Sequence, residues 1–314
     1  MPPRVSILVP AYNAESTVAV TFDSVLAQDF KEWEIVAVDD GSSDATPRIF
    51  ADYARRDPRI RIAHNDRNLG MTANWNRCLA LATGDFVIKL DSDDVFKPGA
   101  LASFLAPFDD LNVIAVGVRT LSTDEQLEPF DGIPGDDAMM RAGIDPYADH
   151  VLAASAWYAV AAHGHQLWAS SSFMTRRVLL VSRGGFDERF GCAADTEMMW
   201  RLMEGDGKIA HVARVGSLYR IRRGSVSDVY RKQDWLTWEG TAANLLTLSR
   251  VRTHRKLPRS LRMHYVRLWR RWQTSTRALP PNVESKLASV VSEVSAPPFL
   301  DVAMTRARDA VSAS

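Results

Sequence analysis

Cysteine is scarce in this chain, with two among 314 residues. Cys78 and Cys192 lie far apart and lack the spacing of a metal-binding motif, which excludes a disulfide framework and a zinc site built on paired cysteines. Histidines offer no alternative, because no matching cluster of Cys or His accompanies His163 and His165. We therefore expect reduced, structural thiols and a cytoplasmic chain.

Long apolar runs and a net charge are also missing. The N-terminal apolar run ends at Asn13 and Glu15, too early for a signal peptide. The next most apolar stretch, Val151–Ala162, has about twelve residues, whereas a bilayer needs roughly 20. Formal net charge is zero, so bulk electrostatics indicates no nucleic-acid partner. These absences predict a chain that is neither secreted nor transmembrane.

What the sequence does contain is an alternating α/β pattern. The first 120 residues alternate β-branched runs with helical periodicity, which predicts a mostly parallel central sheet flanked by helices. An irregular segment at 123–165 is interpreted as an excursion or lid over the sheet edge. A last strand pattern at Lys208–Arg222 precedes a helical remainder. We expect strands at Val5–Val9, Glu34–Val38, Ile60–Ala63, Phe86–Leu90 and Val113–Val118, and helices at Ser16–Gln28, Ala45–Arg56, Met71–Ala82, Pro98–Phe108, Val178–Ser182, Lys232–Arg250, Arg259–Arg277 and Pro281–Ser295.

Polar, turn-forming residues follow three of the predicted strands, at Pro10–Asn13, Asp39–Ser42 and Asp91–Asp94. Ligands of parallel α/β sheets bind beyond the carboxyl ends of the strands, where these segments should meet. Crowded carboxylates need a cation or several donors to stay ionised, so Asp91–Asp94 indicates a metal and phosphate platform. An Asp-rich turn explains the same segment without a metal. The convergence of three strand ends favours the ligand site.

Ordered motifs extend from residue 4 to residue 228: VSILVPAYNAE, VAVDDGSSDAT, NLGMTANWNRCLALATGDFV, LDSDD, GGFDERFG followed by Asp195, and YRIRRGSVS. In this order and spacing the chain resembles the inverting family 2 glycosyltransferases with the GT-A fold. The resemblance implies a catalytic domain at 1–228, with a nucleotide-binding half at 1–120 and an acceptor half at 121–228, followed by a helical C-terminal region at 229–314. It also implies Mn²⁺ or Mg²⁺ as cofactor and sugar transfer from a nucleotide diphosphate, with a UDP-sugar favoured, to a saccharide or lipid-linked acceptor.

The nucleotide and metal roles follow from this resemblance. A carboxylate at Asp40 can accept the imide N–H of uracil while the Tyr12 ring lies against the base, although a turn that caps the next helix also explains Asp40. Asp91 and Asp93 should point to the same side of an extended segment. We expect Asp93 to bind the metal, and Asp94 is undecided between a cap and a ligand. Nucleotide contacts are expected from Pro10, Ala11, Tyr12, Glu15, Asp40, Asn68, Asn76, Asp91, Ser92 and Arg222.

Asp195 is the catalytic base that the resemblance implies. Inverting transfer needs a base that takes the acceptor proton while the hydroxyl attacks the anomeric carbon opposite the diphosphate. Relatives usually carry a Glu-Asp pair, whereas this chain has Ala194 before Asp195. Two alternatives therefore stay open: a helix-cap role for Asp195, and a catalytically silent sugar-nucleotide binder or scaffold protein. Acceptor contacts are expected from Trp168, Ser171 and Glu197, the last as a substitute for the missing acid.

The sequence leaves two alternatives open for the basic residue Arg222 and two for the basic segment Arg252–Arg277. Arg222 stands where many relatives have His, and its guanidinium either binds the diphosphate or lies solvated at a strand edge. Arg252–Arg277 holds nine Arg or Lys residues and no acid, and residues 259–277 carry an apolar stripe through Tyr265 and Leu268. Packing on the catalytic domain or on a partner in a homodimer is the favoured interpretation. Peripheral contact with the anionic inner face of a membrane is the alternative.

Overall fold

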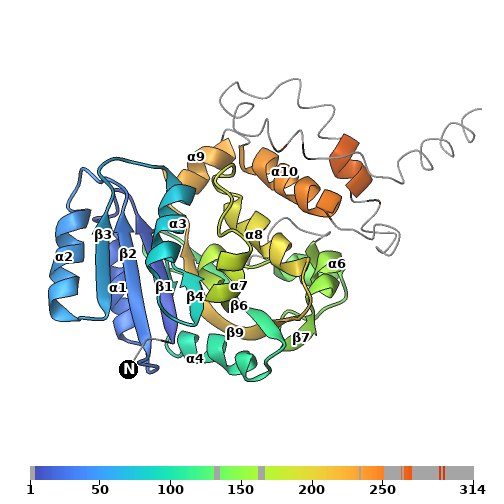
Figure 1. Cartoon of the computed structure of the whole chain (residues 1–314), viewed down its shortest axis with the longest axis horizontal. Helices are drawn as coiled ribbons and strands as arrows, with labels where there is room; N and C mark the ends of the chain where they lie inside the picture. Colours follow the sequence, from blue (N-terminus) through green and yellow to red (C-terminus); the bar gives the residue numbers. More distant parts are fainter. Residues whose placement is uncertain are drawn as a thin grey trace, which may run out of the picture.

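A mixed sheet with the strand order β3-β2-β1-β4-β8-β6-β9-β5 lies at the centre of the protein, and β7 pairs with β9 (Figure 1). The computed structural model describes residues 4–130, 135–161, 167–232, 235–250 and 265–270, together with 263, 290 and 293. Within these residues the strands are β1 (Val5–Ala11), β2 (Trp33–Asp39), β3 (Ile60–His64), β4 (Phe86–Lys89), β5 (Val95–Phe96), β6 (Val113–Thr123), β7 (His150–Ala153), β8 (Phe173–Arg176) and β9 (Lys208–Arg220). The α-helices are α1 (Val18–Leu26), α2 (Thr46–Arg56), α3 (Met71–Leu81), α4 (Ala100–Leu105), α5 (Asp136–Arg141), α6 (Trp157–Ala161), α7 (Arg177–Ser182), α8 (Ala194–Met203), α9 (Val226–Lys232) and α10 (Trp235–Arg250).

Most strands of the sheet point the same way. The neighbours β3, β2, β1 and β4 pair in parallel, and β6 and β9 join this direction because β8 is antiparallel to both β4 and β6. Strands β5 and β7 pair antiparallel with β9. The predicted mostly parallel sheet is therefore confirmed, and the carboxyl ends of β1, β2 and β4 share one edge.

Side-chain alternation along the strands divides the core between the two faces of the sheet. On β1, Ile7 and Val9 face the cluster that includes Phe22 of α1, whereas Leu8 faces the cluster that includes Trp75 of α3. The first cluster also takes residues from α2 and α4, and the second takes residues from α6, α8 and α10. Both faces of the sheet are thus covered, as the near-continuous apolar strands require.

The predicted elements of the first half are confirmed, with local differences. The helix expected over Pro98–Phe108 divides into α4 and a 3₁₀ turn at Ala106–Asp109, because Pro107 has no N–H to continue the α-helical pattern. Strand β5 has two residues, too short for a periodicity to reveal. The segment interpreted as a lid contains α5, β7 and α6, and β7 extends the sheet by pairing with β9.

The C-terminal region packs on the second core cluster. Leu246 of α10 and the buried residues Tyr265 and Leu268 belong to the same cluster as α8. The packing interpretation of the basic helix is supported for residues 265–270, while the rest of 259–277 and most of 281–295 lie outside the described residues. The boundary at residue 228 stays a prediction. Within the described part of the chain, no helix combines the length and apolar character needed to span a bilayer.

Candidate active site

The ends of β1 and β2 form the first part of the site. Pro10 and Ala11 are the last residues of β1, and the carbonyl of Ala11 accepts a hydrogen bond from the Asp40 N–H at 2.8 Å. Tyr12 follows directly, and half of its surface is exposed (51%). An exposed ring at the carboxyl edge of the sheet is available for stacking on a planar ligand.

The carboxylate of Asp40 is buried and holds the loop before α3. It accepts hydrogen bonds from Asn65 Nδ2 at 2.6 Å and from the backbone N–H groups of Leu69 and Gly70 at 2.9 and 3.1 Å. Its neighbour Asp39 accepts from the N–H of Ser42. The described contacts of Asp40 are therefore those of a loop-fixing residue, and its contact with uracil stays a prediction.

Three other residues expected at the nucleotide also bond to nearby protein groups. Glu15 Oε2 accepts from the N–H of Ala45 at 2.8 Å, just before α2, and Asn68 Oδ1 accepts from the N–H of Gly70 at 2.9 Å. Asn76 exchanges two hydrogen bonds with the backbone of Phe186. These bonds shape the loops around the strand ends, and the nucleotide roles of Glu15, Asn68 and Asn76 stay predictions.

The Asp91–Asp94 turn follows β4 and is fixed by its last residue. Asp94 is fully buried; its carboxylate accepts from Ser171 Oγ at 2.5 Å and from the Arg220 N–H at 3.0 Å. Ser171 Oγ in turn accepts from the N–H of Asp91 at 3.1 Å. Burial, with Asp93 and Asp91 nearby, raises the pKa of Asp94 well above its usual range. Asp94 thus joins the turn to β9 and to the segment before β8, and these contacts support the structural alternative for this residue.

Asp93 faces Arg222 across the turn. Arg222 Nε and Nη2 each lie 2.9 Å from Asp93 Oδ2. Burial and the nearby Asp91 raise the pKa of Asp93, while Arg222 opposes that rise. The neighbouring Arg220 is buried, and its Nε and Nη2 have no hydrogen-bond partner among the described residues. Unpartnered donors beside Arg222 make the end of β9 favourable for an anion.

The carboxylates of the turn fit a divalent cation that a phosphate ligand helps to bind. Among the described residues, no three His, Cys, Asp or Glu side chains gather into a ready-made metal site. Mg²⁺ is nevertheless often held by one or two carboxylates together with substrate phosphates. The raised pKa of Asp93 reflects negative charge and burial that a cation would relieve. Asp93, with the half-buried Asp91 and Ser92 beside it, offers oxygen atoms of the kind that Mn²⁺ or Mg²⁺ would take, and its metal role stays a prediction.

Asp195 lies in the first turn of α8, where 6% of its surface is exposed. Its Oδ1 accepts from the N–H of Thr196 at 2.6 Å. Burial raises the pKa of Asp195 to about 6; Lys89 opposes this rise and Asp91 adds to it. A carboxyl group with a pKa close to the working pH is suited to general base catalysis.

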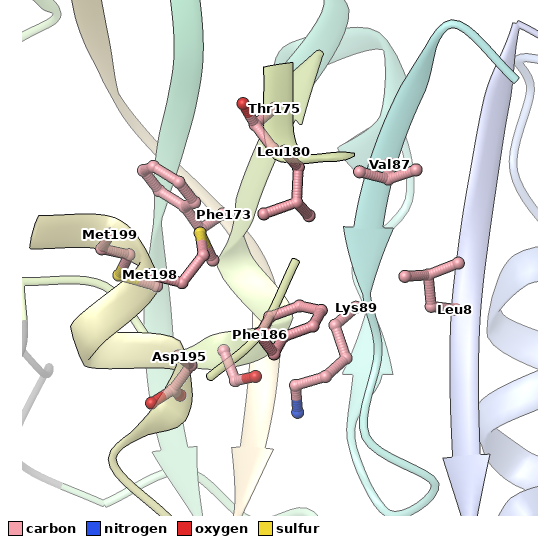
Figure 2. Close-up of a pocket in the computed structure, with 11 residues that line it drawn as sticks. Leu8, Val87, Lys89, Phe173, Thr175, Leu180, Phe186, Asp195, Met198 and Met199 are labelled. Carbon is pink, nitrogen blue, oxygen red and sulfur yellow. The ribbon is translucent and has the colours of Figure 1, made fainter. Parts of the chain in front are cut away.

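Lys89 links Asp195 to the acidic turn, and the sequence reasoning missed it. The residue ends β4, is 4% exposed, pairs with Asp91 and has its Nζ 4.0 Å from the ring centre of Trp75. Lys89 and Asp195 line one small cavity of about 10 Å³, which has room for about one water molecule (Figure 2). A lysine inside the apolar run FVIKL was the available signal, because lysine is rarely buried without a partner.

Of the three expected acceptor residues, Ser171 lies at the acidic turn, whereas Trp168 and Glu197 are buried among other protein groups. Trp168 is buried in the core, where its Nε1 donates to His211 Nδ1 and its ring packs on Trp157. Ser171 is bound to Asp94, as described above. Glu197 is fully buried and pairs with Arg201 one turn along α8, at 2.7 Å. These contacts are structural, so Trp168 and Glu197 present no described surface to an acceptor.

Residues 6–142 match the family described as Glycosyl transferase family 2. Over 238 residues the chain is 30% identical to the succinoglycan biosynthesis protein ExoO of Rhizobium meliloti, a match that covers 73% of this chain and 64% of ExoO. Over 120 residues it is 37% identical to the putative glycosyltransferase EpsE of Bacillus subtilis, covering 37% of this chain and 43% of EpsE. The chain thus spans less than two thirds of either relative.

Solved structures share the fold at low sequence identity. S. aureus TarS in complex with UDP-GlcNAc has a TM-score of 0.67 and 18% identity, covering 93% of this chain and 82% of that one. The mannosyltransferase PcManGT from Pyrobaculum calidifontis, in complex with GDP-Man and Mn²⁺, has a TM-score of 0.58 and 16% identity, covering 98% and 85%. These likenesses confirm the predicted α/β fold of GT-A type.

Proposed function

Because residues 6–142 of this chain belong to glycosyl transferase family 2, we propose that the protein is a metal-dependent, inverting glycosyltransferase of polysaccharide or glycoconjugate assembly. The proposed donor is a UDP-sugar and the proposed acceptor is the hydroxyl group of a saccharide or of a lipid-linked saccharide. The observation that carries the proposal is the buried Asp195 carboxylate, whose pKa is raised to about 6 and responds to the charges of Lys89 and Asp91.

In the proposed reaction, Asp195 removes the proton of the acceptor hydroxyl as that oxygen attacks the anomeric carbon. The bond to the diphosphate breaks on the opposite face, so the configuration of the sugar is inverted. At neutral pH a carboxyl group with a pKa of about 6 is mostly ionised, and it is a stronger base than an ordinary aspartate. Lys89 opposes the rise in pKa and so keeps the group ionised.

The leaving diphosphate meets the positive groups at the end of β9. Asp93 would hold Mn²⁺ or Mg²⁺, which when bound neutralises charge on the departing phosphate oxygens. Arg222, which pairs with Asp93, is placed to donate to the same oxygens. Asp91, paired with Lys89, contacts the nucleotide side, and the exposed Tyr12 ring stacks on the base.

A donor assay with purified protein tests this function. Hydrolysis or transfer from a panel of nucleotide sugars is measured with Mn²⁺, alongside calorimetric binding of UDP. We expect turnover that EDTA abolishes. The absence of an acid before Asp195, where Ala194 stands, favours a second candidate, a silent sugar-nucleotide binder. UDP binding without turnover of any donor would support that candidate.

The proposed setting is the cytoplasm, with peripheral contact at the inner face of the membrane when the acceptor is lipid-linked. The basic segment at 259–277 is the element proposed for that contact, through exposed basic residues such as Arg267, because its apolar residues Tyr265 and Leu268 are buried in the core. Flotation on liposomes with and without anionic lipid tests it, and binding that does not depend on anionic lipid would contradict it. Sedimentation of the same protein tests the expected homodimer.

A further inference from the structure

The helix that carries Asp195 is packed against the C-terminal helix α10, not only against the sheet. Figure 1 shows α10 beside α8. Ala242, Ala243 and Leu246 of α10 are buried in the same cluster as Met198 and Leu202 of α8. Residues after the predicted catalytic domain therefore contribute to the support of α8.

Glu239 makes the polar contact between these helices. It is 5% exposed, and its Oε2 accepts from the N–H groups of Gly191 and Ala193 at 2.9 and 3.1 Å. Ala193 is the N-cap residue of α8, which has no side-chain cap of its own. The first N–H groups of a helix need acceptors from outside it, and a carboxylate is favourable at that positive end. Glu239 thus supplies the acceptor for the N–H of the N-cap residue of α8 and for the loop N–H two residues before it.

Gly191 permits this close approach. A Cβ at this position would lie 2.5 Å from the hydroxyl of Tyr230 and 3.2 Å from Glu239 Oε1. A side chain would therefore displace Tyr230 of α9 and press on the carboxylate. Gly191 lies two residues before the N-cap of α8 and four before Asp195. Its backbone packs against Tyr230 and Glu239.

We infer that Glu239 is a positioning residue, which orients Asp195 by capping the start of α8 from the C-terminal helix. The residue directly before Asp195 is Ala194, which has no carboxylate. The carboxylate at the start of the helix comes instead from Glu239, 44 positions after Asp195 in the chain. The inference rests on the proposed function of Asp195 and makes α10 part of the catalytic unit.

Two variants of the full chain separate the hydrogen bonds from the charge. In Glu239→Gln the amide oxygen still accepts from both N–H groups, because one carboxylate oxygen makes both bonds in the structure. Glu239→Ala removes the acceptor. We expect kcat to fall at least about 10-fold in the alanine variant, since small misplacements of catalytic groups are costly, and to stay within about 3-fold of wild type in the glutamine variant. UDP affinity should be unchanged in both.

The matched control is Asp110→Ala, which removes a carboxylate that accepts from the N–H of Asn112 before β6, at the opposite edge of the sheet. This variant should retain wild-type kcat. Wild-type kcat in Glu239→Ala would overturn the inference. A raised acceptor KM with unchanged kcat in Glu239→Gln would also overturn it, because the carboxylate would then contact the acceptor instead of positioning the base.

Hydrogen exchange keeps the test independent of turnover. The amides of residues 191–199 should exchange faster in Glu239→Ala than in wild type, and at the wild-type rate in Glu239→Gln, because only the alanine variant loses the cap. Unchanged exchange in the alanine variant overturns the inference. If the wild-type protein turns over no donor, the proposed function fails, whereas the exchange result still decides whether Glu239 caps α8. Should Glu239→Ala not fold, Gly191→Ala provides the same comparison by displacing Tyr230 and Glu239.

Discussion

In the Asp195→Asn variant the side chain keeps its shape and loses its charge, so one substitution tests both the base and its environment. Burial raises the pKa of Asp195 from the ordinary value of 3.8 to about 6. The folded protein therefore holds this proton more tightly than the unfolded chain does. Wild type loses the corresponding stability as the pH rises from about 4 through about 6, whereas asparagine does not titrate.

The size of the effect follows from the same pKa. Each pKa unit corresponds to about 1.4 kcal/mol, so the rise to about 6 corresponds to about 3 kcal/mol. At pH 4 the unfolded carboxyl group is already more than half ionised, so the stability of Asp195→Asn relative to wild type should increase by about 2 kcal/mol between pH 4 and pH 7.5. In the same variant, loss of the base should lower kcat by roughly 10²–10⁴-fold.

Urea unfolding of both proteins at several pH values, in EDTA and without donor, measures the stability gap. Turnover is then measured with Mn²⁺ and donor, and UDP affinity is measured by calorimetry, where we expect no change. A stability gap that stays constant with pH would refute the buried, ionising carboxylate. A fully active variant would refute the assignment of the base.

Three further changes test the groups around Asp195. Asp93→Ala should abolish the metal-dependent part of UDP binding, and unchanged affinity in Mn²⁺ contradicts the metal assignment. Arg222→Ala should weaken UDP binding about 10-fold while uridine binding stays the same, because a guanidinium bound to phosphate recognises only the diphosphate; equal losses for both ligands argue against that contact. Lys89→Met should move the acidic limb of the kcat–pH profile above pH 6, because Lys89 opposes the rise in the pKa of Asp195. Lys89→Arg keeps the positive charge and should leave the limb at its wild-type pH. An unmoved limb in Lys89→Met refutes the coupling between Lys89 and Asp195.

The strands and the acidic turn were predictable because their signals are local. Apolar runs such as Val5–Val9 reveal buried parallel strands, and three polar strand ends point to one edge of the sheet. The i, i+4 spacing of Glu197 and Arg201 also predicts a pair on one face of a helix. We nevertheless assigned Glu197 to the acceptor, whereas the structure pairs it with Arg201.

Other parts of the site depend on contacts between distant segments. Asp94 is fixed by Ser171 and by the backbone of Arg220, 77 and 126 residues later. Trp168 resembled a sugar-binding aromatic residue, but its neighbours on α6 and β9 bury it. No periodicity in the sequence reports such pairings, because they follow from the order of the strands.

The anomeric configuration of the product tests the central claim most directly. Proton NMR of the sugar released or transferred from an α-linked UDP-sugar, with Mn²⁺ present, reports it during the first turnovers. We expect a β-configured product from wild type and none from Asp195→Asn. An α-configured product, or equal turnover by the variant, would contradict inversion by Asp195.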